Sequence, residues 1–95
     1  MARLHQFHRD LGDHSVTVTV REGVTTEAML LVDGREVGLQ RFHGHGLQYA
    51  ELSGELPDEP ARPFTVHFDR GPQEDPALRC SLDLEGHRWP LPESP

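Results

Sequence analysis

The chain alternates apolar and polar residues along several short stretches, and a period of two residues is typical of half-buried β-strands. The clearest example is residues 15–22, where three valines share one face and two threonines share the other. β-branched side chains of this kind favour strands. Residues 64–68 and 78–84 alternate in the same way. We therefore predict strands over these three stretches, each with its apolar face turned into a core.

A hairpin is predicted around Asp33-Gly34, because this dipeptide separates two apolar stretches, 27–32 and 35–42. A two-residue type I′ turn requires a positive φ at both turn residues, and Asp-Gly adopts this conformation readily. Such a turn pairs residue 32 with 35, 30 with 37 and 28 with 39. This register gives one face a continuous apolar set: Ala28, Leu30, Val32, Val37 and Leu39.

A second two-residue turn is predicted at Glu85-Gly86, between residues 78–84 and 87–91. Its register pairs Leu82 with Trp89, which predicts that Trp89 packs in the core. It also sets Asp83 opposite Arg88 on the solvent face, a favourable cross-strand pair. Pro90 cannot donate a ladder hydrogen bond, so the last strand is expected at a sheet edge.

The two ends of the chain are less regular. Within residues 1–14, the apolar residues fit helical spacing, and a strand is the alternative. Residues 57–63 contain three prolines and are expected to form an extended loop, while 92–95 are expected to be a frayed tail. We predict a single all-β domain over 1–95. Its fold is expected to be a small antiparallel β-sandwich or barrel of about six to eight short strands.

Composition supports many short strands, because 8 prolines and 9 glycines in 95 residues leave little room for long helices. The chain is acidic, with a formal charge of -7 when its 7 histidines are neutral. A net negative surface repels phosphate groups, so we expect neither nucleic acid nor an anionic membrane as a partner. A protein partner or a cation remains compatible with this charge.

Cys80 is the only cysteine of the chain. One cysteine cannot form an internal disulfide, and residues 1–8 have no apolar run of the kind a signal peptide contains. We therefore expect a cytoplasmic protein. The alternation of residues 78–84 places Cys80 on the apolar face, where a buried thiol is unreactive.

Motifs that carry catalysis are weak in this sequence. Ser53-Gly54 lacks the flanking glycine of a nucleophile elbow, and the paired acids of the loops have no partners that the sequence identifies. The sequence therefore favours a protein without enzymatic activity over an enzyme whose site is assembled from scattered residues.

Histidine is the one enriched residue type with metal-binding chemistry. His43 and His45 are separated by one glycine, so in an extended segment both imidazoles point the same way and could hold zinc or nickel together with the N-terminal histidines. The alternative is that they are solvated loop residues. No second metal-binding pair with the spacing of known zinc motifs is present.

Met29 and Leu31 lie on the opposite face of the hairpin from Leu30 and Val32. Apolar residues on both faces of a sheet need a cover, and we expect either the N-terminal residues or a second subunit to bury them. The leading functional hypothesis is a non-enzymatic protein-binding or interaction module, either a homodimer or a subunit that docks on another protein. The alternative is a small histidine-dependent metal-binding protein.

Overall fold

The computed structural model describes residues 3–43, 49–71 and 77–94, and within these ranges it contains strands and no helix. The all-β prediction is confirmed. The strands are β1 (Arg3–Leu11), β2 (His14–Glu22), β3 (Thr25–Val32), β4 (Arg35–His43), β5 (Tyr49–Leu56), β6 (Arg62–Arg70), β7 (Leu78–Leu84) and β8 (His87–Pro90).

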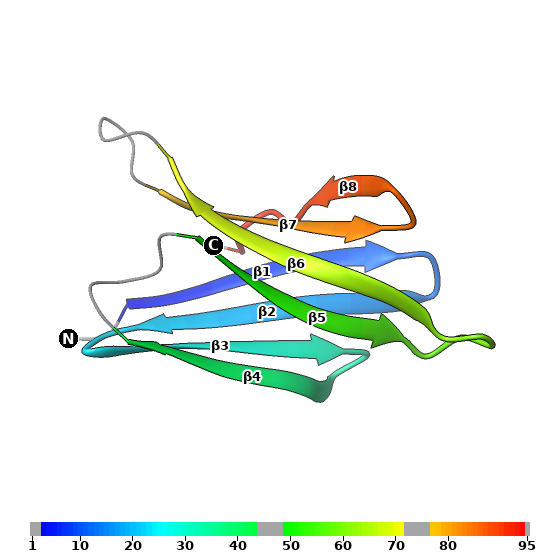
Figure 1. Cartoon of the computed structure of the whole chain (residues 1–95), viewed down its shortest axis with the longest axis horizontal. Coiled ribbons are helices and arrows are strands. Elements are labelled where there is room, and N and C mark those ends of the chain that lie inside the picture. The colour runs from blue at the N-terminus through cyan, green and yellow to red at the C-terminus, as the bar shows by residue number, and fades with distance from the viewer. Residues whose placement is uncertain (1–2, 44–48, 72–76, 95) are drawn as a thin grey trace.

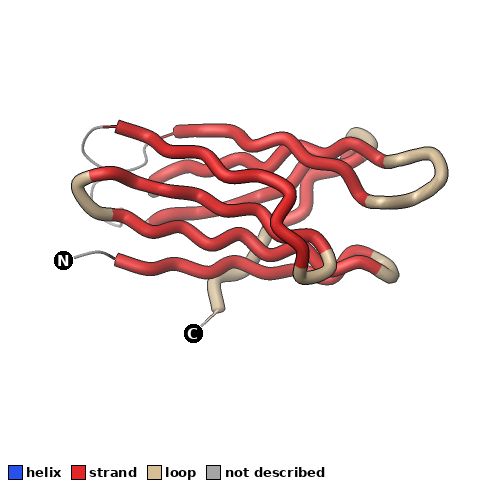
Figure 2. The backbone as a smooth tube through the Cα atoms, turned by 90° about the horizontal axis from the view of Figure 1, so that it is seen from below, coloured by secondary structure: helices blue, strands red, loops and turns tan. Residues whose placement is uncertain are grey.

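The strands form two antiparallel sheets of four, in the orders β1-β2-β3-β4 and β5-β6-β7-β8. Within each sheet, every strand pairs with the next along the chain, and the two sheets pack face to face as a sandwich (Figure 1). Loops are concentrated at the two ends of the sandwich (Figure 2). We call the first sheet A and the second sheet B. The sandwich is therefore the correct one of the two predicted architectures.

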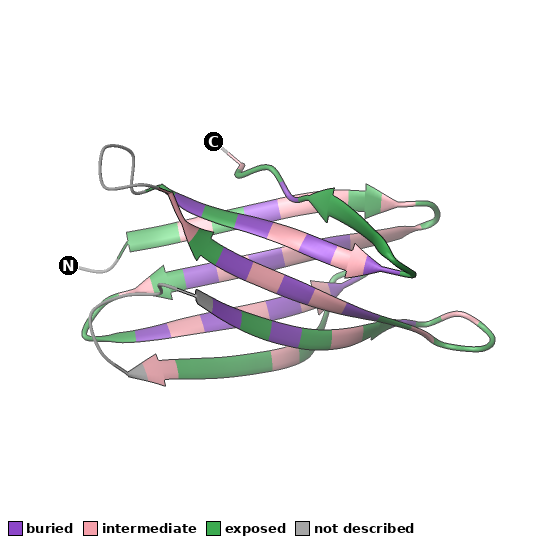
Figure 3. Cartoon of the chain, turned by 45° about the horizontal axis from the view of Figure 1, so that its top comes forward, coloured by how far each residue is buried: buried purple, intermediate pink, exposed green. Residues whose placement is uncertain are grey.

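The core lies between the sheets and is built from alternate residues of the inner strands. In β2, β3, β6 and β7, buried positions alternate with partly exposed ones (Figure 3). Burying a single valine, leucine or phenylalanine contributes about 1.5–3 kcal/mol. The period-two pattern of the sequence therefore identifies the core of these strands. Its fully buried large side chains include Phe7, Val16, Val18, Val20, Leu30, Leu56, Val66, Phe68 and Leu82.

Both predicted hairpin turns are present. Asp33 and Gly34 have φ values of 53° and 79°, and Glu85 and Gly86 have 52° and 81°. Positive φ at both central residues is the mark of a type I′ turn. In the second hairpin Asp83 pairs with Arg88, which donates hydrogen bonds of 2.8 and 3.0 Å to the two carboxylate oxygens.

Trp89 pairs with Leu82 as predicted, but the expectation that it packs in the core is wrong, because 36% of the residue is exposed. The reason is that β8 is a four-residue edge strand whose residues are all exposed. The guanidinium of Arg9 covers one face of the indole, 4.9 Å from the ring centroid. Trp89 therefore lies at the edge of the sandwich and not in its interior.

Residues 3–11 and 92–94, the described segments nearest the two ends of the chain, are both hydrogen-bonded into sheet A. Residues 3–11 form β1, so the strand alternative for the N-terminal segment is correct and the helical one is wrong. Residues 92–94 are not frayed. The His8 amide donates to the Pro92 carbonyl (3.1 Å), and the Ser94 amide donates to the Gln6 carbonyl (2.7 Å). The C-terminal segment thus covers the outer edge of β1.

Candidate functional site

The outer face of sheet A carries a small apolar cluster where β3 and β4 meet. Met29 is the direct cross-strand partner of Leu39, and Leu31 lies two residues along β3 on the same face. Met29 and Leu31 are partly exposed, and Leu39 is 48% exposed. We call these three residues the sheet A patch. Thr17 and Thr19 of β2 flank it as the partners of Leu31 and Met29.

Leu39 belongs to the patch because β4 contains a bulge that was not predicted from the sequence. Val32 pairs with Arg35 as expected, but the register shifts between Leu30 and Leu31, so Leu30 pairs with Gly38 and not with Val37. A shift by one residue moves every later side chain to the other face. The predicted apolar face of β4 is therefore wrong.

The bulge has two consequences for the surface. Leu39 turns outward beside Met29, while Gly38 faces the core, where a Cβ would lie 3.7 Å from the Leu30 Cβ. Val37, the extra residue, is 44% exposed. The bulge thus adds Leu39 to the outer face on which the two predicted interface residues, Met29 and Leu31, lie, and it leaves Val37 exposed.

The structure decides between the two segments that were expected to bury Met29 and Leu31, the N-terminal residues and a second subunit. Residues 3–11 pair with β2 as an edge strand of the same sheet, so the N-terminal segment does not fold over the patch. Phe7, the large apolar residue of this segment, is buried in the core between the sheets. A second subunit remains as the predicted cover.

A depression of about 330 Å³ lies between the β3–β4 hairpin and the end of β5. Its lining includes the apolar residues Val32, Val37 and Pro57 and the charged residues Arg35 and Glu55. We call it the flank depression. It lies beside β4 and β5, which are edge strands of the two sheets.

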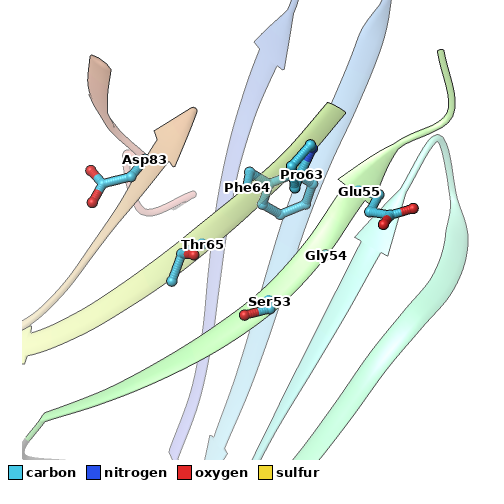
Figure 4. A pocket seen from close by; sticks show the side chains of 7 residues that line it. All are labelled: Ser53, Gly54, Glu55, Pro63, Phe64, Thr65 and Asp83. Carbon is cyan, nitrogen blue, oxygen red and sulfur yellow. The ribbon is translucent and has the colours of Figure 1, made fainter. Parts of the chain in front are cut away.

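A wider, shallower depression of about 500 Å³ lies over β5, β6 and β7 (Figure 4). Ser53, Thr65 and Asp83 form one row across these three strands. The Asp83 carboxylate is already engaged by Arg88 and His67, and the Arg88 contact holds the pKa of this carboxyl down at about 2. The two hydroxyls of this depression and its paired carboxylate do not indicate one class of ligand over another.

The predicted metal ligands lie at the margin of the described structure. His43 is the last residue of β4, and nothing is described of its side chain, while His45 lies outside the described residues. In the described ranges there is no group of three or more histidine, cysteine, aspartate or glutamate side chains arranged to hold a metal ion. The zinc or nickel site therefore stays a prediction.

Several described histidines instead contact carboxylates. His5, His14 and His67 each have a carboxylate oxygen within 3.6 Å of both ring nitrogens. The acids come from other strands or loops, so these contacts could not be found by sequence spacing. Cys80 behaves as expected, because it is buried and that burial raises the pKa of its thiol to about 12.

Comparison of the chain with models of known protein families, with curated proteins and with solved structures gave no match. A search of the described ranges for a helix long and apolar enough to cross a membrane also gave none. The arrangement of the side chains is therefore the basis for any functional argument.

Proposed function

We propose that this chain is a non-enzymatic protein-interaction module that associates with a second copy of itself through the sheet A patch. The observation that supports the proposal most directly is the contact of Met29 with Leu39 on an outer face, next to Leu31. Contiguous apolar side chains on the outer face of a sheet are typical of a surface that a partner covers.

The charges around the patch favour a second copy as the partner. At one end of the patch, Glu36 is the outward-facing partner of Leu31. At the other end, Arg21, Glu27 and Arg41 form a row across β2, β3 and β4, with one positive charge in excess. A two-fold axis that crosses the patch at right angles to the strands would bring the acidic end of each copy over the basic end of the other. Self-complementarity of this kind is what a symmetric dimer requires.

The size of the patch sets the expected strength of association. Leu39 is the most exposed of its three residues, and fully burying a leucine contributes about 1.5–3 kcal/mol. Association must also offset the lost freedom of the two molecules, so a weak dimer that depends on concentration is expected.

The same proposal includes a cytoplasmic location and a protein as the partner. The lone cysteine, which is a free thiol in the core, is compatible with a reducing compartment. The formal charge of -7 disfavours nucleic acid and anionic membranes as partners.

Sedimentation velocity over a wide range of concentrations tests the proposal. The unmodified protein should show a sedimentation coefficient that rises with concentration. Leu39→Glu should remain a monomer, because near the two-fold axis it places two like charges in an apolar contact. The matched control is Val24→Glu, the same type of change at a position that is 99% exposed, between β2 and β3. The control should associate like the unmodified protein.

Two results would overturn the proposal. A monomer at every concentration up to the millimolar range would exclude self-association as a function. A dimer that persists in Leu39→Glu would show that another surface is used. Circular dichroism of both variants checks that the strand content is unchanged.

A further inference from the structure

His14 links the two sheets at one end of the sandwich. It is the first residue of β2, and its side chain is only 15% exposed. Its Nδ1 lies 2.7 Å from Asp33 Oδ2, and its Nε2 lies 2.7 Å from Asp58 Oδ1. Asp33 belongs to the β3–β4 turn of sheet A, whereas Asp58 belongs to the loop between β5 and β6 of sheet B. One imidazole therefore joins two segments that no β-ladder connects.

Both of these contacts require the ring to carry two protons. An ionised carboxylate only accepts hydrogen bonds, so both His14 nitrogens must donate. A neutral imidazole has one N–H group and one lone pair, and that lone pair would face a carboxylate oxygen at 2.7 Å. Deprotonation therefore converts one of the two attractive contacts into a repulsive one.

The surroundings keep both acids ionised. The second oxygen of Asp33 accepts a hydrogen bond of 2.9 Å from the Ser15 amide. The second oxygen of Asp58 lies 3.4 Å from Arg62, which also binds Glu85 in the β7–β8 turn. These contacts, together with His14, hold the pKa values of both aspartates below their usual range. The hydrogen bond to Asp58, followed by that to Asp33, raises the pKa of His14.

The flank depression lies between the same two segments. Asp33 belongs to its hairpin wall, together with Val32 and Val37. Pro57, the residue before Asp58, belongs to the opposite wall. The span of the His14 bridge from Asp33 to Asp58 therefore limits how far the two walls can separate.

We propose that His14 is a pH-dependent latch that holds the β5–β6 loop against the β3–β4 turn and thereby keeps the flank depression narrow. When the ring is protonated, it ties the two walls together. When it loses a proton, Asp33 and Asp58 repel each other and the lone pair, so the loop carrying Asp58 moves away and the depression widens. This latch operates whether or not the sheet A patch forms a dimer.

The pH range in which the latch is closed follows from the directions in which the pKa values of His14, Asp33 and Asp58 are shifted. A raised histidine pKa gives a stabilisation that is complete below the ordinary histidine value, about 6.5, and is lost as the pH rises through the higher folded value. Lowered aspartate pKa values give a stabilisation that is present above about 4 and is lost as the pH falls through the folded values. The latch is therefore closed between about pH 4 and pH 6.5 and opens on the alkaline side of this window.

NMR spectroscopy of the full chain can test the latch. The titration of the His14 ring gives its protonation, and the amides of Asp58, Glu59 and Ala61 report the state of the loop. We expect the loop amide shifts to change with the same midpoint as the His14 ring, above about 6.5. The heteronuclear NOE of these amides should fall on the alkaline side of that midpoint, because a released loop gains fast motion.

Two variants provide the comparison. Asp58→Asn removes one carboxylate from the bridge, so it should lower the midpoint of the His14 ring and abolish the pH response of the loop. His67→Gln is the matched control. His67 is 16% exposed and also lies between two carboxylates, Glu51 and Asp83, but all three belong to sheet B. This control should leave the loop response unchanged. A His14 ring that titrates at or below about 6.5, or a loop that does not respond to it, would overturn the proposal.

Discussion

Replacing Gly54 with alanine tests how closely the two sheets approach each other. Gly54 lies in β5 and faces the core, where a Cβ would lie 2.8 Å from Leu30 Cδ2 and 2.9 Å from Phe64 Cζ. Ordinary contacts between carbon atoms are about 3.5–4.0 Å. Leu30 and Phe64 are both buried, so neither can turn away into solvent. The alanine methyl group therefore forces the leucine, the ring or the β5 backbone to shift.

The expected cost of this shift can be estimated from other overpacked cores. Adding a methyl group to a well-packed core destabilises proteins by about 1–3 kcal/mol. In a domain of this size, each 1 kcal/mol lowers the melting temperature by about 4–8 °C. Urea denaturation of Gly54→Ala should show a lower midpoint with an unchanged slope, because the surface exposed on unfolding is the same.

Gly38→Ala is the matched control, because Gly38 approaches the same leucine from sheet A. A Cβ at Gly38 would meet Leu30 Cβ at 3.7 Å, which is an ordinary contact. Alanine also restricts the unfolded chain, so this variant should be unchanged or more stable by up to about 1 kcal/mol. The packing argument fails if Gly54→Ala is as stable as the unmodified protein, or if the two variants lose the same stability.

Three other predictions concern particular side chains. Cys80 should react slowly with iodoacetamide in the native protein and rapidly in urea, because its thiol is buried and has a pKa of about 12; rapid native labelling would contradict this. Arg88, and then His67, hold the pKa of Asp83 at about 2, so its stabilisation is present above about pH 4 and is lost as the pH falls through 2. The urea midpoint of Asp83→Asn should therefore fall less between about pH 4 and pH 2 than that of the unmodified protein, and an equal fall would contradict the assignment. Zinc or nickel should raise the melting temperature if the predicted site exists, and replacing His43 and His45 with alanine should abolish the rise; a parent protein that does not respond would exclude the site.

The features that could be predicted from the sequence depend on local rules. Strand alternation needs only the side-chain period of two, so residues 15–22, 64–68 and 78–84 were assigned correctly. The turns at Asp33-Gly34 and Glu85-Gly86 need only residues that tolerate a positive φ. Neither inference requires knowledge of what packs above the strand.

The bulge in β4 could not be predicted in the same way. Residues 35–42 are compatible with either register, because Val37 and Leu39 are both apolar and two positions apart. The structure places Gly38 inward, where a Cβ would be in ordinary contact with Leu30, and turns Leu39 outward beside Met29. The bulge, and not the local apolar pattern, thus determines which face of β4 is exposed, and it adds Leu39 to the patch that we propose as the interface.

Contacts between residues that are far apart in the sequence account for the other features that could not be predicted. The carboxylate partners of the histidines are the main example. His14 meets an acid 44 positions away and His5 meets one 88 positions away. In a chain with 16 acidic residues, no spacing rule selects these partners. A metal ion needs a neutral ring with a lone pair to offer, whereas the closed latch that we propose needs the His14 ring to donate from both nitrogens. Closing the latch and binding a metal ion would therefore compete for the His14 ring, and the predicted zinc or nickel site involves two other histidines, His43 and His45.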